Sequence, residues 1–165
     1  MKSVLIIRHA KSSWDDPAQD DFDRPLNDRG KRDAPQMAKR LLEKGIQIDC
    51  FISSPAKRAR RTAGLFAAEY NVTKDQLILV EALYHPGPAD IFQAIAHAPG
   101  DKDTIALFSH NPGVTEFVNM LTDVRIDDMP TCAVFAVKAP VRHWTEFMEA
   151  AKEFWFFDYP KSLTT

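Results

Sequence analysis

The chain has 165 residues, 45% of them apolar and 27% charged, which is typical of one folded domain spanning residues 1–165 and excludes a disordered tail protein. Its 21 basic and 23 acidic side chains give a net charge of −2, which argues against a general nucleic-acid binder. The first 62 residues nevertheless hold 14 of the basic and 9 of the acidic side chains, so this region favours an anionic ligand.

The first third of the chain predicts two strands and a helix between them. Residues 4–7 form a short apolar run typical of a strand buried on both faces. Residues 15–30 are polar, contain two prolines and predict a long surface loop. A helix is expected over residues 31–44, with Gly45 as its stop, and residues 50–52 form a second short strand.

The rest of the chain continues the alternation of helices and strands. We expect Ser54 to cap a helix that has Pro55 at its first position and continues through Tyr70. The later predicted elements are a short apolar run at 77–80, a helix at 89–98, a strand at 104–108, a helix at 114–121, strands at 132–137 and 154–158, and a helix at 142–152 between those two strands.

This alternation predicts an α/β fold with a mainly parallel central sheet between helix layers, in which the late strand pair is partly antiparallel. Ligands of such sheets bind beyond the carboxyl ends of the strands. Three strand ends carry conspicuous groups: Arg8 with His9, the segment from Ser54 to Arg58, and Ser109 with His110.

The sequence predicts a cytoplasmic protein that does not enter a membrane. Cys50 and Cys132 are far apart and form no CxxC pattern, so we expect buried thiols in a reducing compartment rather than a disulfide or zinc site. The apolar run at 4–7 is too short for the core of a signal peptide, and no later stretch approaches a membrane span.

The three strand ends together predict a phosphate pocket. A buried guanidinium such as that of Arg8 needs an anionic partner, and Arg58 lies where helix N–H groups also favour an anion. Planar guanidinium groups suit phosphate oxygens. A neutral imidazole beside such cations is a competent nucleophile for phosphoryl transfer, and His9 and His110 are placed to approach one another.

Each of these residues taken singly has an ordinary structural interpretation. One histidine after a strand is more often a hydrogen-bonded residue of the core or surface, so the agreement of the three strand ends carries the hypothesis. We keep His85 as a further candidate for substrate binding, while His97 and His143 have no such support. Most of Lys57, Arg60 and Arg61 are expected to form a solvated basic rim, whose role stays open.

Four ordered motifs resemble those of the histidine phosphatase superfamily. They are LIIRHAKSSWDDP, DRPLNDRGKRDA, ISSPAKRARRTA and LFSHNPGV. RHAKSSW, the compact length, and the late MPTCAV and YPKSL are similar to the SixA branch, the phosphohistidine phosphatases. The resemblance extends from Leu5 to Leu163.

The resemblance implies His9 as a nucleophile that forms a phosphohistidine intermediate, with Arg8, Arg58 and His110 completing the phosphate pocket. It also implies a three-layer α/β/α fold of the phosphoglycerate mutase type, with no metal and no cofactor. Relatives often have an asparagine where Asp15 stands here. Because a carboxylate there would repel phosphate, we expect Asp15 to face away.

Two further residues have open roles. Monoesterases of the superfamily use a carboxyl group to protonate the leaving alkoxide, and Glu81 is the candidate for that role, its alternative being a solvated loop carboxylate. Imidazole leaves more readily than an alkoxide, so a phosphohistidine phosphatase could work without such an acid. Arg24 either reaches the phosphate or pairs with Asp23 or Asp28 in the loop.

The leading hypothesis is therefore a metal-independent phosphatase whose partner is a phosphorylated protein, such as a histidine-containing phosphotransfer domain. The alternatives are a small-molecule phosphomonoesterase that uses Glu81 as general acid, and a phosphate-binding module without catalysis. None of these hypotheses involves nucleic acid or a membrane.

Overall fold

The protein is built on one six-stranded sheet with the strand order β3-β2-β4-β1-β5-β6. The structure, a computed structural model, describes residues 1–160. In chain order the strands are β1 (Lys2–Arg8), β2 (Cys50–Ser53), β3 (Ile78–Leu79), β4 (Thr104–Ser109), β5 (Val134–Ala139) and β6 (Glu153–Asp158). The first four are parallel, β5 is antiparallel to β1, and β6 is antiparallel to β5. The expected mainly parallel sheet with an antiparallel late pair is confirmed.

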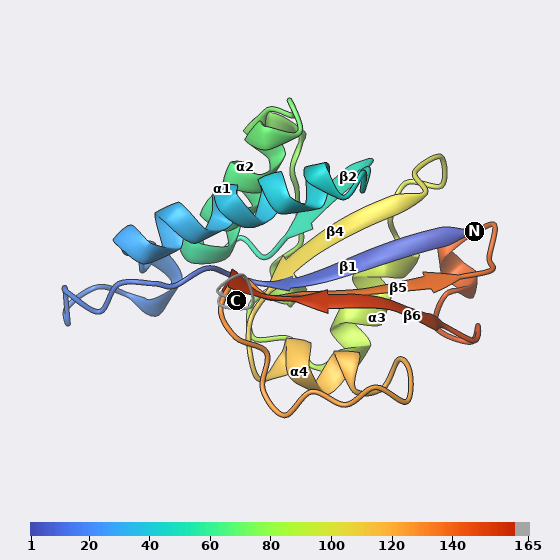
Figure 1. Ribbon diagram of the computed structural model, residues 1–165. Helices are drawn as coiled ribbons and strands as arrows, with labels where there is room; N and C mark the ends of the chain where they lie inside the picture. The colour runs from blue at the N-terminus through green and yellow to red at the C-terminus, as the bar shows by residue number, and fades with distance from the viewer. Residues whose placement is uncertain (161–165) are drawn as a thin grey trace.

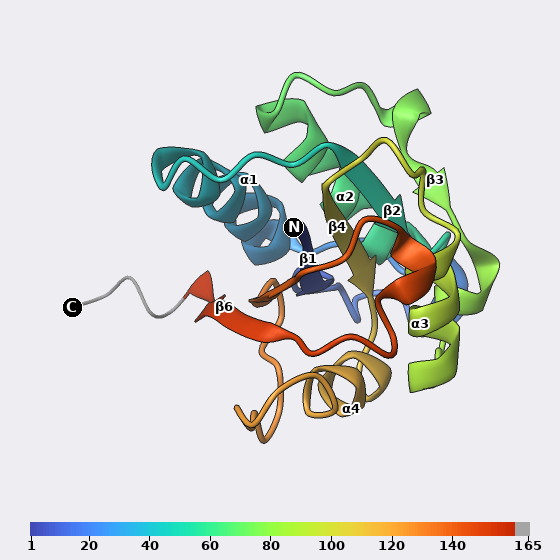
Figure 2. The ribbon, with the colours of Figure 1, turned by 90° about the vertical axis from the view of Figure 1, so that its right-hand side faces the viewer.

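Helices cover both faces of the sheet. In Figure 1, α1 (Asp28–Glu43) and α2 (Lys57–Glu69) lie above the strands, whereas α3 (Pro88–Ala96) and α4 (Gly113–Val118) lie below them. Figure 2 shows the same two helix layers from the side. The three-layer α/β/α arrangement is therefore confirmed.

The central strand β1 divides the core in two. Val4 and Ile6 belong to the cluster between the sheet and the helices α3 and α4. Leu5 and Ile7 belong to the cluster between the sheet and the helices α1 and α2. All four side chains are fully buried, as the apolar run predicts. The strand then ends at Arg8, which pairs in register with Ser109 of β4, so the residues after both strands leave the sheet side by side.

The helix α1 starts earlier than its predicted first residue at position 31, because Asn27 caps it by accepting a hydrogen bond from the backbone N–H of Gly30 at 2.9 Å. Gly30 lies against the backbone of Lys11, and a Cβ at this position would overlap the Lys11 carbonyl oxygen. This close approach fastens the start of α1 to the segment that follows the candidate nucleophile His9. The helix ends before Gly45, whose φ of +75° fits the predicted stop.

The predicted start of α2 is wrong. The helix begins at Lys57 rather than at Pro55, because the Ser54 hydroxyl accepts the backbone N–H of Ala56 and also contacts His110. Ser54 therefore belongs to the loop after β2. The run at 77–80 forms only the two-residue strand β3, and both of its residues are exposed rather than buried.

The helix predicted at 142–152 is also wrong, since this segment contains only a 3₁₀ turn, η4 (Trp144–Glu146). Trp144 and Phe147 are buried, but Met148 in the following turn is 54% exposed. One turn of buried apolar surface is too little to stabilise a longer helix. Three further 3₁₀ turns are η1 (Asp21–Asp23), η2 (Lys74–Gln76) and η3 (Glu81–Leu83).

Cys50 and Cys132 are free, buried thiols. Within residues 1–160, no helix is both long enough and apolar enough to cross a membrane. The prediction that residues 1–165 form a single domain extends past the described part of the chain, and the closing motif YPKSL lies partly outside it as well.

Candidate active site

The register between β1 and β4 brings two of the predicted histidines together. The backbone N–H of His9 donates to the carbonyl of Ser109 at 3.1 Å, and the ring centroids of His9 and His110 are 5.2 Å apart. Both side chains are buried. The structure therefore places the two imidazoles at the carboxyl edge of the sheet, where the fold class expects a ligand.

The His9 ring is held in one tautomer. Its Nδ1 lies 2.7 Å from the carbonyl oxygen of Ala10, and because a carbonyl only accepts, Nδ1 carries the proton. Burial lowers the pKa of His9 to about 3, and the neighbouring Arg58, Arg8 and Arg24 act in the same direction. At neutral pH the ring is uncharged, and Nε2 keeps its lone pair.

His110 is oriented by Ser54, whose hydroxyl lies 2.7 Å from Nε2. Its Nδ1 is buried and has no hydrogen-bond partner within residues 1–160. Burial and the nearby His9 and Arg58 hold the pKa of His110 well below its ordinary value. His110 is thus a neutral imidazole beside the candidate nucleophile.

Three arginines face this pair from different elements. Arg8 ends β1 and donates to the carbonyl of Met129 at 2.8 Å. Arg58, in the first turn of α2, is 3% exposed, and Arg24, in the loop before α1, is 8% exposed. The Nε atoms of all three are buried without a hydrogen-bond partner in the described part of the chain. Buried donors of this kind suit an anion with several oxygens.

The carboxylate of Asp21, which was not among the residues predicted from the sequence, accepts hydrogen bonds from two of these arginines. Arg58 donates to its Oδ2 at 3.0 Å and Arg24 to its Oδ1 at 3.2 Å. The Tyr84 hydroxyl donates to Oδ2 at 2.7 Å, and His85 Nε2 lies 3.6 Å from the same oxygen. The Asp21 carboxylate therefore accepts hydrogen bonds from groups that a bound phosphate would also need as donors.

Electrostatics keep the Asp21 carboxylate ionised. Partial burial acts to raise its pKa, but hydrogen bonds from Tyr84, Arg58 and Arg24 hold the pKa of this carboxyl well below its ordinary value. Burial and the bond to Asp21 raise the pKa of the Tyr84 hydroxyl, which stays a donor. The one local feature that could have suggested Asp21 is its position three residues before Arg24, a spacing at which the two side chains can form an ion pair.

Arg24 forms an ion pair in the loop, but its partner differs from the two that the sequence suggested. Its guanidinium pairs with Asp21, not with Asp23 or Asp28, and it also donates to the buried Ser12 hydroxyl. The Arg24 guanidinium stacks 3.8 Å from the centre of the Trp14 ring. Arg24 therefore joins the arginine cluster and forms an ion pair at the same time.

The remaining candidate residues differ in how they lie relative to the imidazoles of His9 and His110. The centroid of the His85 ring lies 4.0 Å from that of the Tyr84 ring, to which it is tilted by 34°, and 6.0 Å from that of the His110 ring, so His85 borders the site. Glu81 is exposed in η3, and Asp15 is exposed in the loop between β1 and η1; within residues 1–160 neither carboxylate forms an ion pair with the arginines of the candidate pocket. His97 and His143 are exposed elsewhere. No group of three His, Cys, Asp or Glu residues in the described chain is arranged to hold a metal ion.

Comparisons with known proteins identify the family of the chain. The family model of the histidine phosphatase superfamily (branch 1) matches residues 4–83. An uncharacterised chloroplastic protein of Arabidopsis thaliana is 30% identical over 161 residues, which cover 88% of this chain and 70% of that protein. The chain belongs to the histidine phosphatase superfamily.

Solved structures identify the fold within that superfamily. A structure from Agrobacterium tumefaciens that is named for the phosphohistidine phosphatase SixA has a TM-score of 0.79 and 22% identity, covering 96% of this chain and 99% of that chain. A protein histidine phosphatase SixA complexed with tungstate has a TM-score of 0.82 and 21% identity, covering 98% and 99% of the two chains. The chain has the phosphoglycerate mutase-like fold of these phosphatases, and its family membership supports a phosphatase enzyme.

Proposed function

We propose that the protein is a metal-independent phosphatase that removes the phosphoryl group from phosphohistidine on a phosphotransfer protein, with His9 as the nucleophile. The observation that carries this proposal is the state of the His9 ring. Its Nδ1 proton is engaged by Ala10, which leaves the lone pair of Nε2 available in a buried, cationic pocket.

In the first step, Nε2 of His9 attacks the phosphorus in line with the bond that breaks. The substrate reacts with a proton on the other nitrogen of its phosphorylated ring, so the electron pair of the N–P bond goes to the leaving nitrogen and a neutral imidazole departs, while the phosphoryl group becomes bonded to His9. Arg8, Arg24 and Arg58 neutralise the charge on the transferring oxygens, and His110 is positioned to donate a further hydrogen bond.

In the second step, water attacks the phosphorus of the phosphorylated His9. The Nε2–P bond breaks with its electron pair returning to the ring, and the hydrogens of the water leave with the phosphate. Two easier displacements thus replace one direct attack by water on the substrate. No metal ion or cofactor takes part in either step of this proposal.

The proposed substrate also suits the position of Glu81. An imidazole whose conjugate acid has a pKa of about 6.5 leaves without the strong general acid that an alkoxide needs. Glu81 is exposed, and within residues 1–160 no ion pair holds its carboxylate in place, so nothing orients it for the acid role that a phosphomonoesterase requires.

The test compares the purified protein, in the presence of EDTA, on a phosphohistidine-bearing phosphotransfer domain and on a small alkyl phosphate. We expect turnover of the phosphohistidine substrate, its loss in His9→Ala, and unchanged turnover in Glu81→Gln. Preference for the alkyl phosphate together with loss of activity in Glu81→Gln would instead favour the phosphomonoesterase. Phosphate binding without turnover of either substrate would favour the non-catalytic module.

A further inference from the structure

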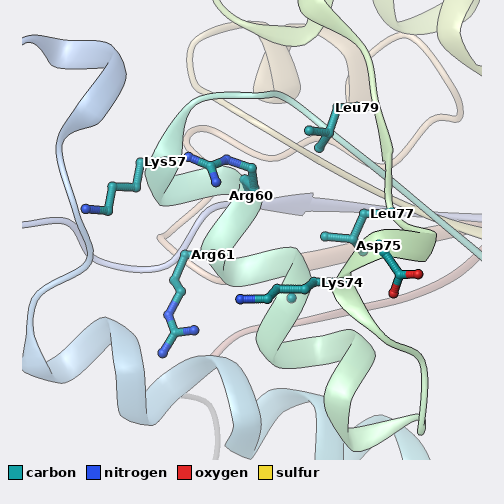
Figure 3. A pocket seen from close by; sticks show the side chains of 8 residues that line it. Lys57, Arg60, Arg61, Lys74, Asp75, Leu77 and Leu79 are labelled. Atoms are coloured by element: carbon teal, nitrogen blue, oxygen red, sulfur yellow. The ribbon is translucent and has the colours of Figure 1, made fainter.

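A second hollow lies beside the candidate active site, between α2 and the segment from η2 to β3 (Figure 3). Its volume is about 370 Å³. Most of the side chains that line it are cations, on the rim, and leucines, on the floor: Lys57, Arg60, Arg61, Lys74, Leu77 and Leu79. We call this hollow the basic groove.

The cations of the basic groove are not neutralised by the protein itself. Within residues 1–160, no carboxylate lies within ion-pair distance of Lys57, Arg60, Arg61 or Lys74, and the one side-chain hydrogen bond among them joins Arg60 to the carbonyl of Pro55 at 3.2 Å. Asp75 also lines the groove, but Figure 3 shows its carboxylate on the far side from Arg61. Four cations on one short surface of a protein with net charge −2 favour an acidic ligand.

The floor of the groove is apolar and open. Leu79 is 48% exposed. Gly64 contributes no side chain, and no heavy atom lies within 4 Å of the place where its Cβ would be. The aliphatic stems of the rim lysines and arginines add to this apolar surface. The groove therefore suits an apolar side chain flanked by carboxylates better than a uniformly charged polymer.

The groove and the candidate active site are built on neighbouring residues of the same elements. Lys57 directly precedes Arg58 in α2, and Leu79 pairs in register with Ser53, the residue before Ser54. A ligand in the groove would thus continue from a phosphoryl group held between Arg58 and His9. This continuity points to a segment of the same molecule that carries the phosphoryl group.

We infer that the basic groove docks an acidic segment of the phosphoprotein substrate, with an apolar side chain of that segment on Leu77 and Leu79 and its carboxylates on the rim. The inference rests on the proposed function, because it assigns the groove to the same substrate. A nucleic acid fits less well, since the apolar floor offers nothing to a phosphodiester backbone and the protein as a whole is acidic.

The test uses the variants Arg61→Glu and Lys74→Glu, which reverse charges on the rim, and Gly64→Leu, which fills the floor. Arg142→Glu is the matched control, because it makes the same change of charge at an exposed position. Arg142 follows β5, whose last residue pairs with Lys2 at the start of β1, so it lies at the end of the sheet away from His9. Thermal unfolding of each variant verifies that it is folded. The leucine is compatible with a helix, where it is favoured over glycine.

The first measurement is kcat/KM on an acidic, phosphohistidine-bearing phosphotransfer domain and on free phosphohistidine. We expect Arg61→Glu, Lys74→Glu and Gly64→Leu each to lower kcat/KM about tenfold for the protein substrate, through KM, and to leave free phosphohistidine within about twofold. Arg142→Glu should change neither. Equal losses in Arg61→Glu and Arg142→Glu, or equal losses on both substrates, would overturn the inference.

A second measurement separates docking from catalysis. The His9→Ala protein, which cannot turn over the substrate, is titrated with the same phosphorylated domain by calorimetry. The titration is repeated with the double variant that also carries Arg61→Glu, and a single-stranded oligonucleotide serves as competitor. Weaker binding of the domain in the Arg61→Glu background supports docking even if no turnover is found in the wild type. Unchanged binding of the domain in the Arg61→Glu background contradicts the inference. So does an oligonucleotide that binds the protein more tightly than the domain does and displaces the domain.

Discussion

Asp21 accepts two hydrogen bonds from the guanidinium of Arg58, across 37 positions of sequence. Arg58 donates to the Asp21 carboxylate at 3.0 Å and to the Asp21 backbone carbonyl at 2.6 Å. In the proposed reaction, the phosphoryl oxygens take over these donors. Asp21 is thus an internal anion that competes with substrate and product for the arginine cluster.

Replacement of Asp21 by asparagine should strengthen phosphate binding. The amide keeps the size of the side chain but removes the competing negative charge. The positive charges of Arg24 and Arg58 are then no longer neutralised and attract orthophosphate more strongly. We expect about tenfold tighter binding of orthophosphate by calorimetry. Asp23→Asn, an exposed change in the same 3₁₀ turn, is the control and should leave the affinity unchanged. Weaker binding in Asp21→Asn would show that the carboxylate assists phosphate.

The same substitution should lower stability in a pH-dependent way. Because the pKa of Asp21 is held below its ordinary value in the folded protein, its contribution to stability is present above the ordinary carboxyl pKa of about 4 and is lost as the pH falls through the folded-state pKa. We expect the melting temperature of Asp21→Asn to lie below that of the wild type at pH 7, with the gap closing in acid. A gap that widens in acid has the wrong sign for this account.

His9 should remain neutral over the range in which an ordinary histidine titrates. With its pKa lowered to about 3, the imidazole chemical shifts of His9 should stay constant between pH 8 and pH 5 in an NMR titration. The unfolded chain binds this proton near pH 6.5, so His9 also makes stability fall as the pH decreases below that value. A titration midpoint of His9 near 6.5 would contradict the buried, cationic environment.

The contact between Ser54 and His110 predicts that Ser54 is a positioning residue. Ser54→Ala removes the hydroxyl that lies 2.7 Å from His110 Nε2, and no other hydrogen bond orients the ring within residues 1–160. We expect about a fivefold loss of kcat with little change in KM, because one neutral hydrogen bond is worth about 1 kcal/mol. The neighbouring Ser53, which is equally buried and donates to the Ser54 carbonyl, provides the control Ser53→Ala. A loss confined to KM would place Ser54 in substrate binding instead.

Two glycines should respond in opposite directions to the same change. Gly30→Ala forces a Cβ into the Lys11 carbonyl and should cost about 2 kcal/mol or more of the free energy of unfolding. Gly64→Ala has open space around its Cβ and should stabilise α2 by about 0.5–1 kcal/mol. Urea denaturation of both variants measures these differences. A neutral effect of Gly30→Ala would mean that α1 can move away from the segment after His9.

How far the sequence could predict this structure depends on the range of the interactions. The apolar runs of β1 and β4 depend on burial alone, and they were sufficient to predict that Arg8, His9 and His110 follow strand ends. Asp21 was missed because its partners Arg58 and Tyr84 are 37 and 63 positions away, and nothing in the local sequence indicates that pairing. Ser54 was misassigned as a helix cap for a similar reason, since its contact with His110 spans 56 positions.

The central claim of the account is that His9 carries the phosphoryl group between substrate and water. The most direct measurement is a rapid quench, in alkali, of the protein mixed with a substrate labelled in its phosphoryl group, followed by peptide mapping. We predict a transient acid-labile phosphoryl group on the peptide that contains His9, and none in His9→Ala. Label on His110, or undiminished turnover by His9→Ala, would contradict the assignment of His9 as the nucleophile.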